Sequence, residues 1–192
     1  MRKAIVLTAI GLTTLFATGC GSSDSSSTSD TSMAESTLNE FNDADVMFAQ
    51  MMIPHHEQAI EMSDIALDPT VGASDEIRAL AEDIKAAQDP EIAQMTAFLE
   101  SWGQPVAMDS SMDHSSMMSG MLTVEEIETL GSLRGAEFDM AWLEAMIKHH
   151  EGAIQMADDV LSSGVNADVK TLAEEIISTQ QSEIDAMRTM LS

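Results

Sequence analysis

Apolar residues recur at intervals of three and four positions along most of this chain, starting near Asn42. That period is typical of helices with one buried face. It predicts four long helices, at about 43 to 67, 75 to 101, 134 to 162 and 167 to 191. A short helix is also expected at 123 to 131, because Thr123 can cap its first turn together with Glu126. No segment has a convincing strand pattern, so we expect an all-α fold.

The two halves of the chain repeat each other. A shift of 94 residues places the first long helix on the third, and a shift of 92 places the second on the fourth. The matched pairs include Asp45 with Asp139, Met52 with Met146, His55 with His149, His56 with His150, Met62 with Met156, Gln88 with Gln180, Glu91 with Glu183 and Met95 with Met187. Each half, about 43–101 and 134–192, is therefore predicted to be a helix hairpin. Two hairpins can bury their apolar faces against each other as a four-helix bundle over residues 43–192.

The N-terminal region predicts an export signal followed by a tether. A basic start leads into an apolar run, and Ala17-Thr18-Gly19-Cys20 resembles the cleavage box of bacterial lipoproteins. We expect residues 1–19 to be the signal peptide and Cys20 to carry lipid. Residues 20–42 are rich in Ser, Thr, Asp and Gly, which bury too little apolar surface to offset ordering. The expected product is a cell-envelope lipoprotein facing the periplasm or the cell exterior, anchored to the membrane through Cys20.

Composition and charge exclude several classes of function. The chain has 33 acidic and 8 basic residues, for a net charge of −25, which excludes nucleic acid as a natural partner. Cys20 is the single cysteine, so disulfides, thiolate zinc sites and cysteine nucleophiles are absent from the mature fold. No Glu stands three residues before any helical histidine, which disfavours a carboxylate di-iron oxidase. No phosphate-binding loop or Ser-His-Asp order suggests nucleotide or hydrolase chemistry.

Methionine is the unusual component, with 17 residues. At 100° per residue, His55 shares one stripe of its helix with Met51, Met52 and Met62, and His56 lies at the other edge of the same face. Methionine stripes usually fill cores, and a lone histidine on one is usually a hydrogen-bonded core residue. Packing alone, however, does not require two His-His pairs at equivalent repeat positions.

The second half contains a copy of this arrangement. It is made of His149, His150, Met146 and Met156. Met95 and Met187 lie on the facing helices and are expected to join the first and second groups. Gln88 and Gln180 interrupt the apolar stripes of those helices, and a buried amide needs a partner. His56 and His150 are therefore expected either to ligate a metal or to be held by these amides.

The connection at 103–122 contains a second concentration of methionine. Its candidate ligands are Met108, Met112, His114, Met117, Met118 and Met121. The other residues of this stretch are polar or glycine, so core packing does not explain these thioethers. Thioethers are soft, uncharged ligands that select Cu(I) or Ag(I). The loop is therefore predicted to be a flexible capture site beside the two helical sites. Because imidazole must lose its proton to bind metal, histidine-dependent binding is expected to weaken below about pH 6.

These motifs resemble the domain of unknown function 305 family. The resemblance rests on MIPHHEQAIEM at 52–62, MIKHHEGAIQM at 146–156, and the Gln-x-x-Glu-Ile-x-x-Met segments at 88–95 and 180–187. It covers about Asp43 to Leu191. The resemblance implies a ferritin-like four-helix bundle, export to the cell envelope and, as in some members, copper binding and copper resistance.

Three functions of different classes fit these observations. The preferred one is a copper-binding protein for metal buffering, trafficking or resistance, using Cu(I), with Ag(I) or Cu(II) as further ions, and without catalysis. The second is a copper-dependent oxidase, which needs an open coordination position. The third is an envelope interaction or stress protein whose His-Met face is only core. Metal analysis separates the third from the others, and turnover with a reductant and oxygen separates the first two.

Overall fold

The computed structural model describes residues 40–107 and 118–192. Within them the chain forms α2 (Asp43–Leu67), α3 (Asp75–Ser101), α4 (Val124–Ser132), α5 (Gly135–Ser163) and α6 (Ala167–Met190), and no strand. The all-α prediction is confirmed, and each predicted helix boundary lies within one residue of the observed one. Predicted functional residues outside the described ranges are Cys20, Met108, Met112, His114 and Met117.

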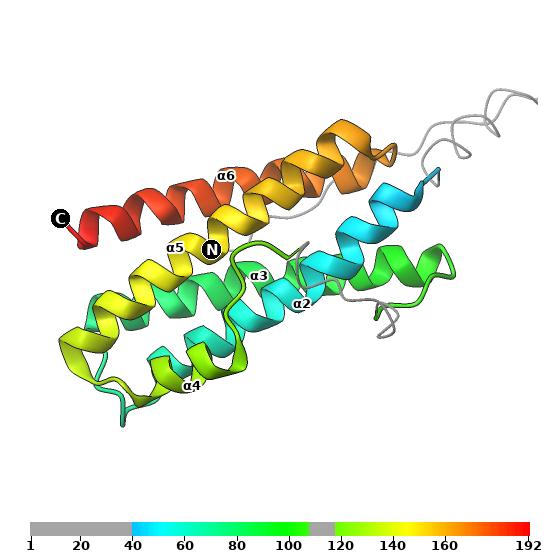
Figure 1. Ribbon diagram of the computed structural model, residues 1–192. Coiled ribbons are helices and arrows are strands. Elements are labelled where there is room, and N and C mark those ends of the chain that lie inside the picture. The colour runs from blue at the N-terminus through cyan, green and yellow to red at the C-terminus, as the bar shows by residue number, and fades with distance from the viewer. Residues whose placement is uncertain (1–39, 108–117) are drawn as a thin grey trace, which may run out of the picture.

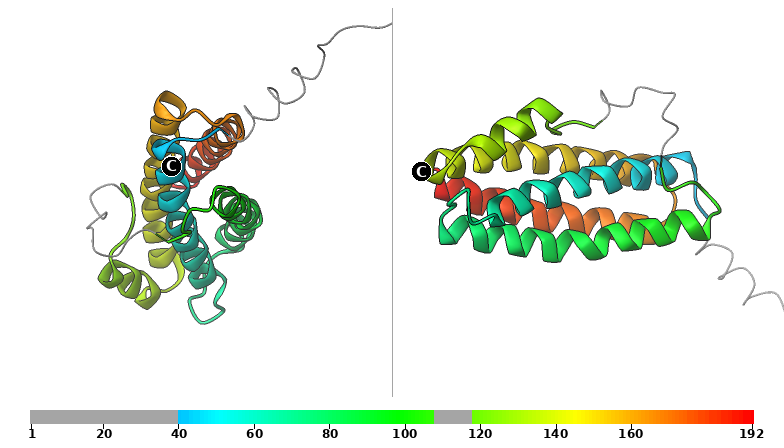
Figure 2. Two further views of the ribbon diagram at one scale, coloured as in Figure 1. Left: turned by 90° about the vertical axis from the view of Figure 1, so that its right-hand side faces the viewer. Right: turned by 90° about the horizontal axis from the view of Figure 1, so that it is seen from below.

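The four long helices lie side by side as two hairpins (Figure 1). Helix α2 packs on α3 and α5 packs on α6, while α2 and α5 join the hairpins. The short helix α4 lies outside the long helices, against α5 (Figure 2). This arrangement agrees with the hairpin-plus-hairpin prediction, and the ferritin-like classification stays a prediction. None of the described helices has the length and apolar character needed to cross a membrane.

Two aspartates at equivalent repeat positions tie the hairpins together. The buried Asp45 carboxylate accepts hydrogen bonds from the backbone N–H of Asn42, at the start of its own helix. It also accepts from the N–H groups of Val165 and Asn166, which precede α6 in the other hairpin. Asp139 accepts in the same way from the N–H of Ser74, the N-cap of α3. Each carboxylate therefore accepts hydrogen bonds at the start of a helix in the opposite hairpin.

The difference between these caps predicts unequal effects on stability. Asp45→Ala is expected to lower the free energy of unfolding by about 3 kcal/mol, because one buried and two partly buried N–H groups lose the carboxylate that accepts from them. Asp139→Ala should cost about 1 kcal/mol, since its carboxylate is partly exposed and accepts from a single N–H. Urea unfolding of both variants measures the difference. Equal losses would contradict this account.

The core is divided by a polar layer. One apolar cluster contains Met51, Met52, Met95 and Met156, and the other contains Met62, Met146 and Met187. Every long helix carries a polar residue where it passes from one cluster to the other. These residues are the pair His55 and His56 on α2, Gln88 on α3, the pair His149 and His150 on α5, and Gln180 on α6. The fold therefore gathers four imidazoles and two amides near the middle of the helices. We call this set the histidine layer.

Candidate metal centre

All four imidazoles of the histidine layer are buried, with side chains no more than 1 % exposed. Their position follows from the sequence: each His-His pair lies one turn after a buried methionine and one turn before a buried alanine. The rings of His55 and His149 meet across the interface between α2 and α5, with centroids 3.8 Å apart. The two repeat halves thus contribute to one central group of histidines.

Two glutamates hold the second histidine of each pair. The Nε2–H of His56 donates to Glu91 Oε2 at 2.7 Å, and the Nε2–H of His150 donates to Glu183 Oε2 at 2.7 Å. The alternative in which Gln88 and Gln180 hold these histidines is wrong, because neither amide has a hydrogen-bond partner among the described residues. Glu91 and Glu183 lie three residues after these glutamines, at matched repeat positions. The same residue type at both repeat positions indicated a shared role, but the sequence prediction gave these glutamates none.

The first histidine of the first pair is held by the segment that enters α4. The Nε2–H of His55 donates to the backbone carbonyl of Ser119 at 3.1 Å. The amide of Gln58 fixes the same segment by bonding both the N–H and the carbonyl of Leu122, each at 2.8 Å. Gly152 stands at the repeat position equivalent to Gln58 and lets the segment approach α5. A Cβ there would lie 1.8 Å from the Ser119 carbonyl oxygen.

Gly152→Ala is therefore expected to displace the Ser119 segment and break its bond to His55. Because the added methyl meets backbone, the 118–122 segment must move away as a unit. Helicity should change little, while the amide proton signals of 118–122 should shift or broaden. Ala153→Gly removes a methyl from the next position, weakens the helix by about 1 kcal/mol and should leave that segment in place. Two-dimensional NMR of both variants provides the measurement, and an unshifted segment in Gly152→Ala would contradict it.

Burial favours the neutral form of two of these imidazoles, His55 and His149. The pKa of His55 is lowered from 6.5 to about 3, mainly by burial and then by His56, while the bond to Ser119 opposes the change. The pKa of His149 is well below its usual value, again mainly through burial and then through His55. Protons therefore compete with a metal for these rings at lower pH than the sequence predicted. The weakening of histidine-dependent binding below about pH 6 that the sequence predicted is therefore not expected from His55 and His149.

The layer contains an unusual number of buried polar atoms without hydrogen-bond partners. They are Nδ1 of all four histidines, Nε2 of His149, and both amide atoms of Gln88 and Gln180. In His55, His56 and His150 Nε2 makes the hydrogen bond, so in a neutral ring Nδ1 is the nitrogen that carries the lone pair. Metal-ligating histidines commonly have this arrangement, with one nitrogen donating to a carboxylate or carbonyl and the other facing the metal. The residues present therefore fit a metal ion.

The ligand types narrow the kind of metal. Within residues 40–107 and 118–192, no three or more His, Cys, Asp or Glu side chains are grouped so as to hold an ion. A site with three or more protein ligands here would therefore need another ligand type beside imidazole, and thioether is the type that the sequence predicted. Neutral nitrogen and sulfur ligands favour Cu(I) over Mg²⁺, Ca²⁺ or Mn²⁺, which take oxygen ligands.

In the structure the predicted methionine ligands form groups that differ from those expected from the sequence. Met62 and Met156 each lie seven residues beyond a histidine, about 10 Å along the helix. Each therefore belongs to the apolar cluster on the other side of the histidine layer from the methionines that precede that histidine. Met62 packs with Met146 and Met187, while Met156 packs with Met51, Met52 and Met95. The single-helix stripe that joined Met62 to Met51 and Met52 is therefore not one contact group. Of the described loop residues, Met118 packs against the first cluster and Met121 is partly buried.

Comparisons with known proteins identify the family. The sequence profile of the domain of unknown function DUF305 matches residues 45–191. The chain therefore belongs to the DUF305 family, as its motifs indicated. No match was found among curated proteins.

Solved structures with the same fold include other members of this family. A DUF305 protein from Streptomyces coelicolor, described as a candidate secreted protein, is 34% identical with a TM-score of 0.71, over 77% of this chain and 91% of that one. A DUF305 fragment from Deinococcus radiodurans is also 34% identical, with a TM-score of 0.70, over 78% and 96% of the two chains.

The protein CopM is a third similar structure. Its Cu(I)-bound form is 30% identical to this chain with a TM-score of 0.61, over 76% of this chain and 94% of that one. CopM is also described in Cu(II)-bound, silver-bound and apo forms. The chain is thus similar in sequence and fold to a protein that binds copper and silver.

Proposed function

We propose that this chain is an exported copper-binding protein that buffers, transfers or sequesters copper in the cell envelope. Its ion is Cu(I), with Ag(I) and Cu(II) as further ions, and its ligands are imidazole and thioether groups. The observation that carries the proposal is the histidine layer. Three of its rings are oriented through Nε2 and leave Nδ1 buried without a hydrogen-bond partner, between two methionine-containing clusters.

Energetics supports a ligand role over a packing role for these histidines. A buried polar group without a partner costs about 1 to 3 kcal/mol, and an apolar side chain of similar size avoids that cost. The layer contains nine such atoms at one level of the helices, and five of them are imidazole nitrogens. A core selected only for packing has no need of them. Similarity to CopM, which has copper-bound and silver-bound forms, supports the same function.

The test is a metal titration of the full chain, purified without a chelating tag. Cu(I) and Ag(I) are titrated against a competing chelator, Cu(II) by its visible absorption, and Zn²⁺ serves as a borderline comparison. We expect tight Cu(I) and Ag(I) binding, with histidine ring signals changing in NMR spectra. An acidic helical bundle without Met or His is the control for charge. Equal binding by that control and by this chain would contradict the proposal.

Two further parts of the proposal concern residues outside the described ranges. Lipid on Cys20 would anchor the protein to the envelope membrane, and a Cys20→Ala variant should move to the soluble fraction. Met108, Met112, His114 and Met117, with Met118 and Met121, would capture ions from solvent ahead of the helical sites. Unchanged membrane association of the Cys20 variant would contradict the anchoring.

A further inference from the structure

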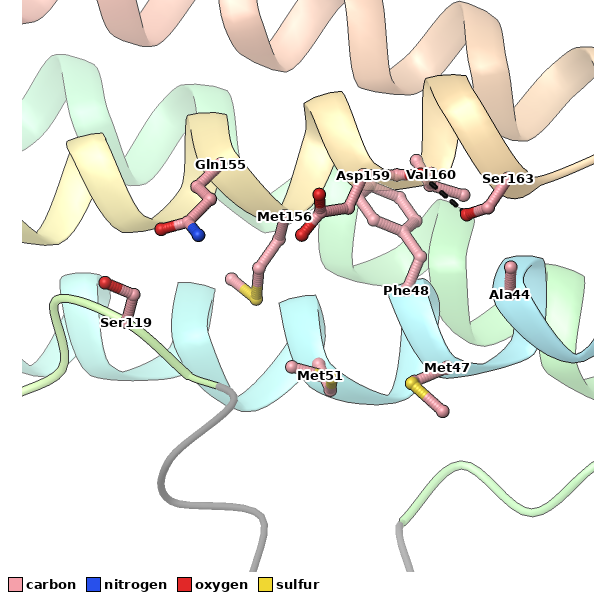
Figure 3. A pocket seen from close by; sticks show the side chains of 10 residues that line it. All are labelled: Ala44, Met47, Phe48, Met51, Ser119, Gln155, Met156, Asp159, Val160 and Ser163. Carbon is pink, nitrogen blue, oxygen red and sulfur yellow. Dashed lines mark hydrogen bonds between the residues drawn. The ribbon is translucent and has the colours of Figure 1, made fainter.

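A groove open to solvent runs between α2 and α5, beside the Ser119 segment (Figure 3). Its volume is about 420 Å³. Three thioethers line it: Met47 and Met51 from α2 and Met156 from α5. Met156 extends from α5 toward α2, Met47 and Met51 extend from α2, and polar Gln155 and Asp159 stand along the α5 side of the groove. We call this feature the methionine groove.

The three methionines differ in exposure, from one at the surface to two that are buried. Met47 is 42% exposed, whereas Met51 and Met156 are 6% and 7% exposed and belong to the same apolar cluster. Met47 and Met51 lie four residues apart, on one face of α2. Met51 in turn lies four residues before His55, so the deep end of the groove adjoins the histidine layer. Met47 faces solvent, where core packing does not account for a long apolar side chain.

The internal repeat provides a comparison within the same molecule. Met47 and Met51 correspond to Ala141 and Ala145 on α5. Those alanines line a hollow with Leu130 and neighbouring residues of α4, which packs over that side of α5. The small side chains there leave room for a covering helix. At the equivalent place on α2, the first half has an open groove and two thioethers instead.

We infer that Met47, Met51 and Met156 form a thioether site for a monovalent soft cation, Cu(I) or Ag(I), distinct from the histidine layer. Three neutral sulfur ligands suit such an ion and bind harder cations poorly. No Lys or Arg is among the described residues that line the groove, and the Asp159 carboxylate on its wall attracts cations. Methionine does not titrate, so the site keeps its ligands at acidic pH. The inference deepens the proposed function and rests on its premise that the chain binds soft metal ions.

The test uses the full chain with its methionine methyl groups labelled with carbon-13. Silver nitrate is added in steps, because Ag(I) is redox-silent and copies the ligand preference of Cu(I). We expect the methyl signals of Met47, Met51 and Met156 to shift together and to reach saturation at a common silver concentration. Because each methionine is read separately, binding at the 108–121 loop does not obscure the result.

Variants then separate this site from the histidine layer. Met47→Leu keeps shape at an exposed position and should weaken silver binding at the other two groove methionines about tenfold, a loss of about 1.4 kcal/mol. Replacing all three by leucine should remove one bound silver ion while the histidine ring signals still respond. The double variant Met140→Leu and Met190→Leu removes two exposed thioethers outside the groove, and should leave groove binding unchanged.

The outcomes distinguish the two proposals. If silver binds the chain but the three groove signals do not move together, the groove site is wrong and the proposed function stands. An undiminished silver count in the folded triple variant, checked by its helical circular dichroism, would have the same meaning. If no methionine or histidine signal responds to silver or Cu(I), both proposals are overturned.

Discussion

Replacing His149 by leucine is expected to strengthen the apo fold while it weakens copper binding. Neither ring nitrogen of His149 has a hydrogen-bond partner among the described residues, so leucine removes two unpaired buried atoms at little cost in volume. The free energy of unfolding should rise by about 1 to 3 kcal/mol. Adding His55→Leu should lower the affinity of the histidine layer for Cu(I) at least about 100-fold, because both rings that meet between α2 and α5 are then lost.

Opposite signs for stability and affinity distinguish ligands from core residues. If a histidine has a structural role, replacing it lowers the free energy of unfolding. If it is present as a ligand, replacing it removes unpaired buried atoms and raises the free energy of unfolding. Gln180→Leu is the matched control, since its buried amide also lacks a partner but is a poor ligand for a soft metal. It should stabilise the fold and leave Cu(I) affinity unchanged. A destabilised His149→Leu variant with unchanged affinity would show that His149 is only part of the core.

The fold could be predicted closely because its determinants are local or repeated. The three-and-four spacing of apolar residues sets each helix, and Thr123 with Glu126 forms the predicted capping box at the start of α4. The repeat predicts two hairpins of the same kind, because segments with matching apolar patterns form matching helices. Asp45 and Asp139 illustrate the limit of this reasoning. Their helical positions were clear, but their partners in the opposite hairpin depend on how the hairpins pack.

The sequence predicted which residues form the candidate site but not which of them contact each other. Helical angles placed His55 and His149 on buried faces, and the structure brings them together across α2 and α5. Angles alone cannot show rise along the helix, so Met62 and Met156 were assigned to the wrong neighbours. Glu91 and Glu183 were missed because they lie at the edge of the apolar stripe, where a carboxylate can reach inward and remain 14 to 15 % exposed. Such contacts require the distance between two helices.

The Ser119 segment could not have been foreseen from any periodic pattern. Its approach to α5 depends on Gly152, which looks unremarkable inside a helix, and on a positive φ at Gly120. A Cβ on Gly120 would lie 2.4 Å from the carbonyl oxygen of Lys148. The two glycines together let backbone pass where side chains would block it. The asymmetry between His55 and His149 follows from this segment, since it bonds one ring and not the other.

Acidification is expected to destabilise the apo protein well before its carboxylates become protonated. Unfolded histidines bind a proton near pH 6.5, whereas folded His55 does so only near pH 3 and folded His149 also has a strongly lowered pKa. Between these values the unfolded chain holds more protons, so the free energy of unfolding falls as pH falls. For two such histidines the loss from pH 7 to pH 5.5 should be about 2 to 3 kcal/mol.

Urea unfolding in the presence of a chelator at several pH values measures this slope. The variant with leucine at both His55 and His149 should lose most of it, because the two titrating groups are gone from the folded and the unfolded chain. The range above pH 5.5 is chosen because repulsion among the 33 acidic residues begins to relax as carboxylates take up protons at lower pH, which stabilises the fold and opposes the histidine effect. A slope that is unchanged in the double variant would mean that these histidines are not held neutral by burial. In that case protons and copper would compete for them near pH 6, and the histidine layer would release its metal in mildly acidic surroundings.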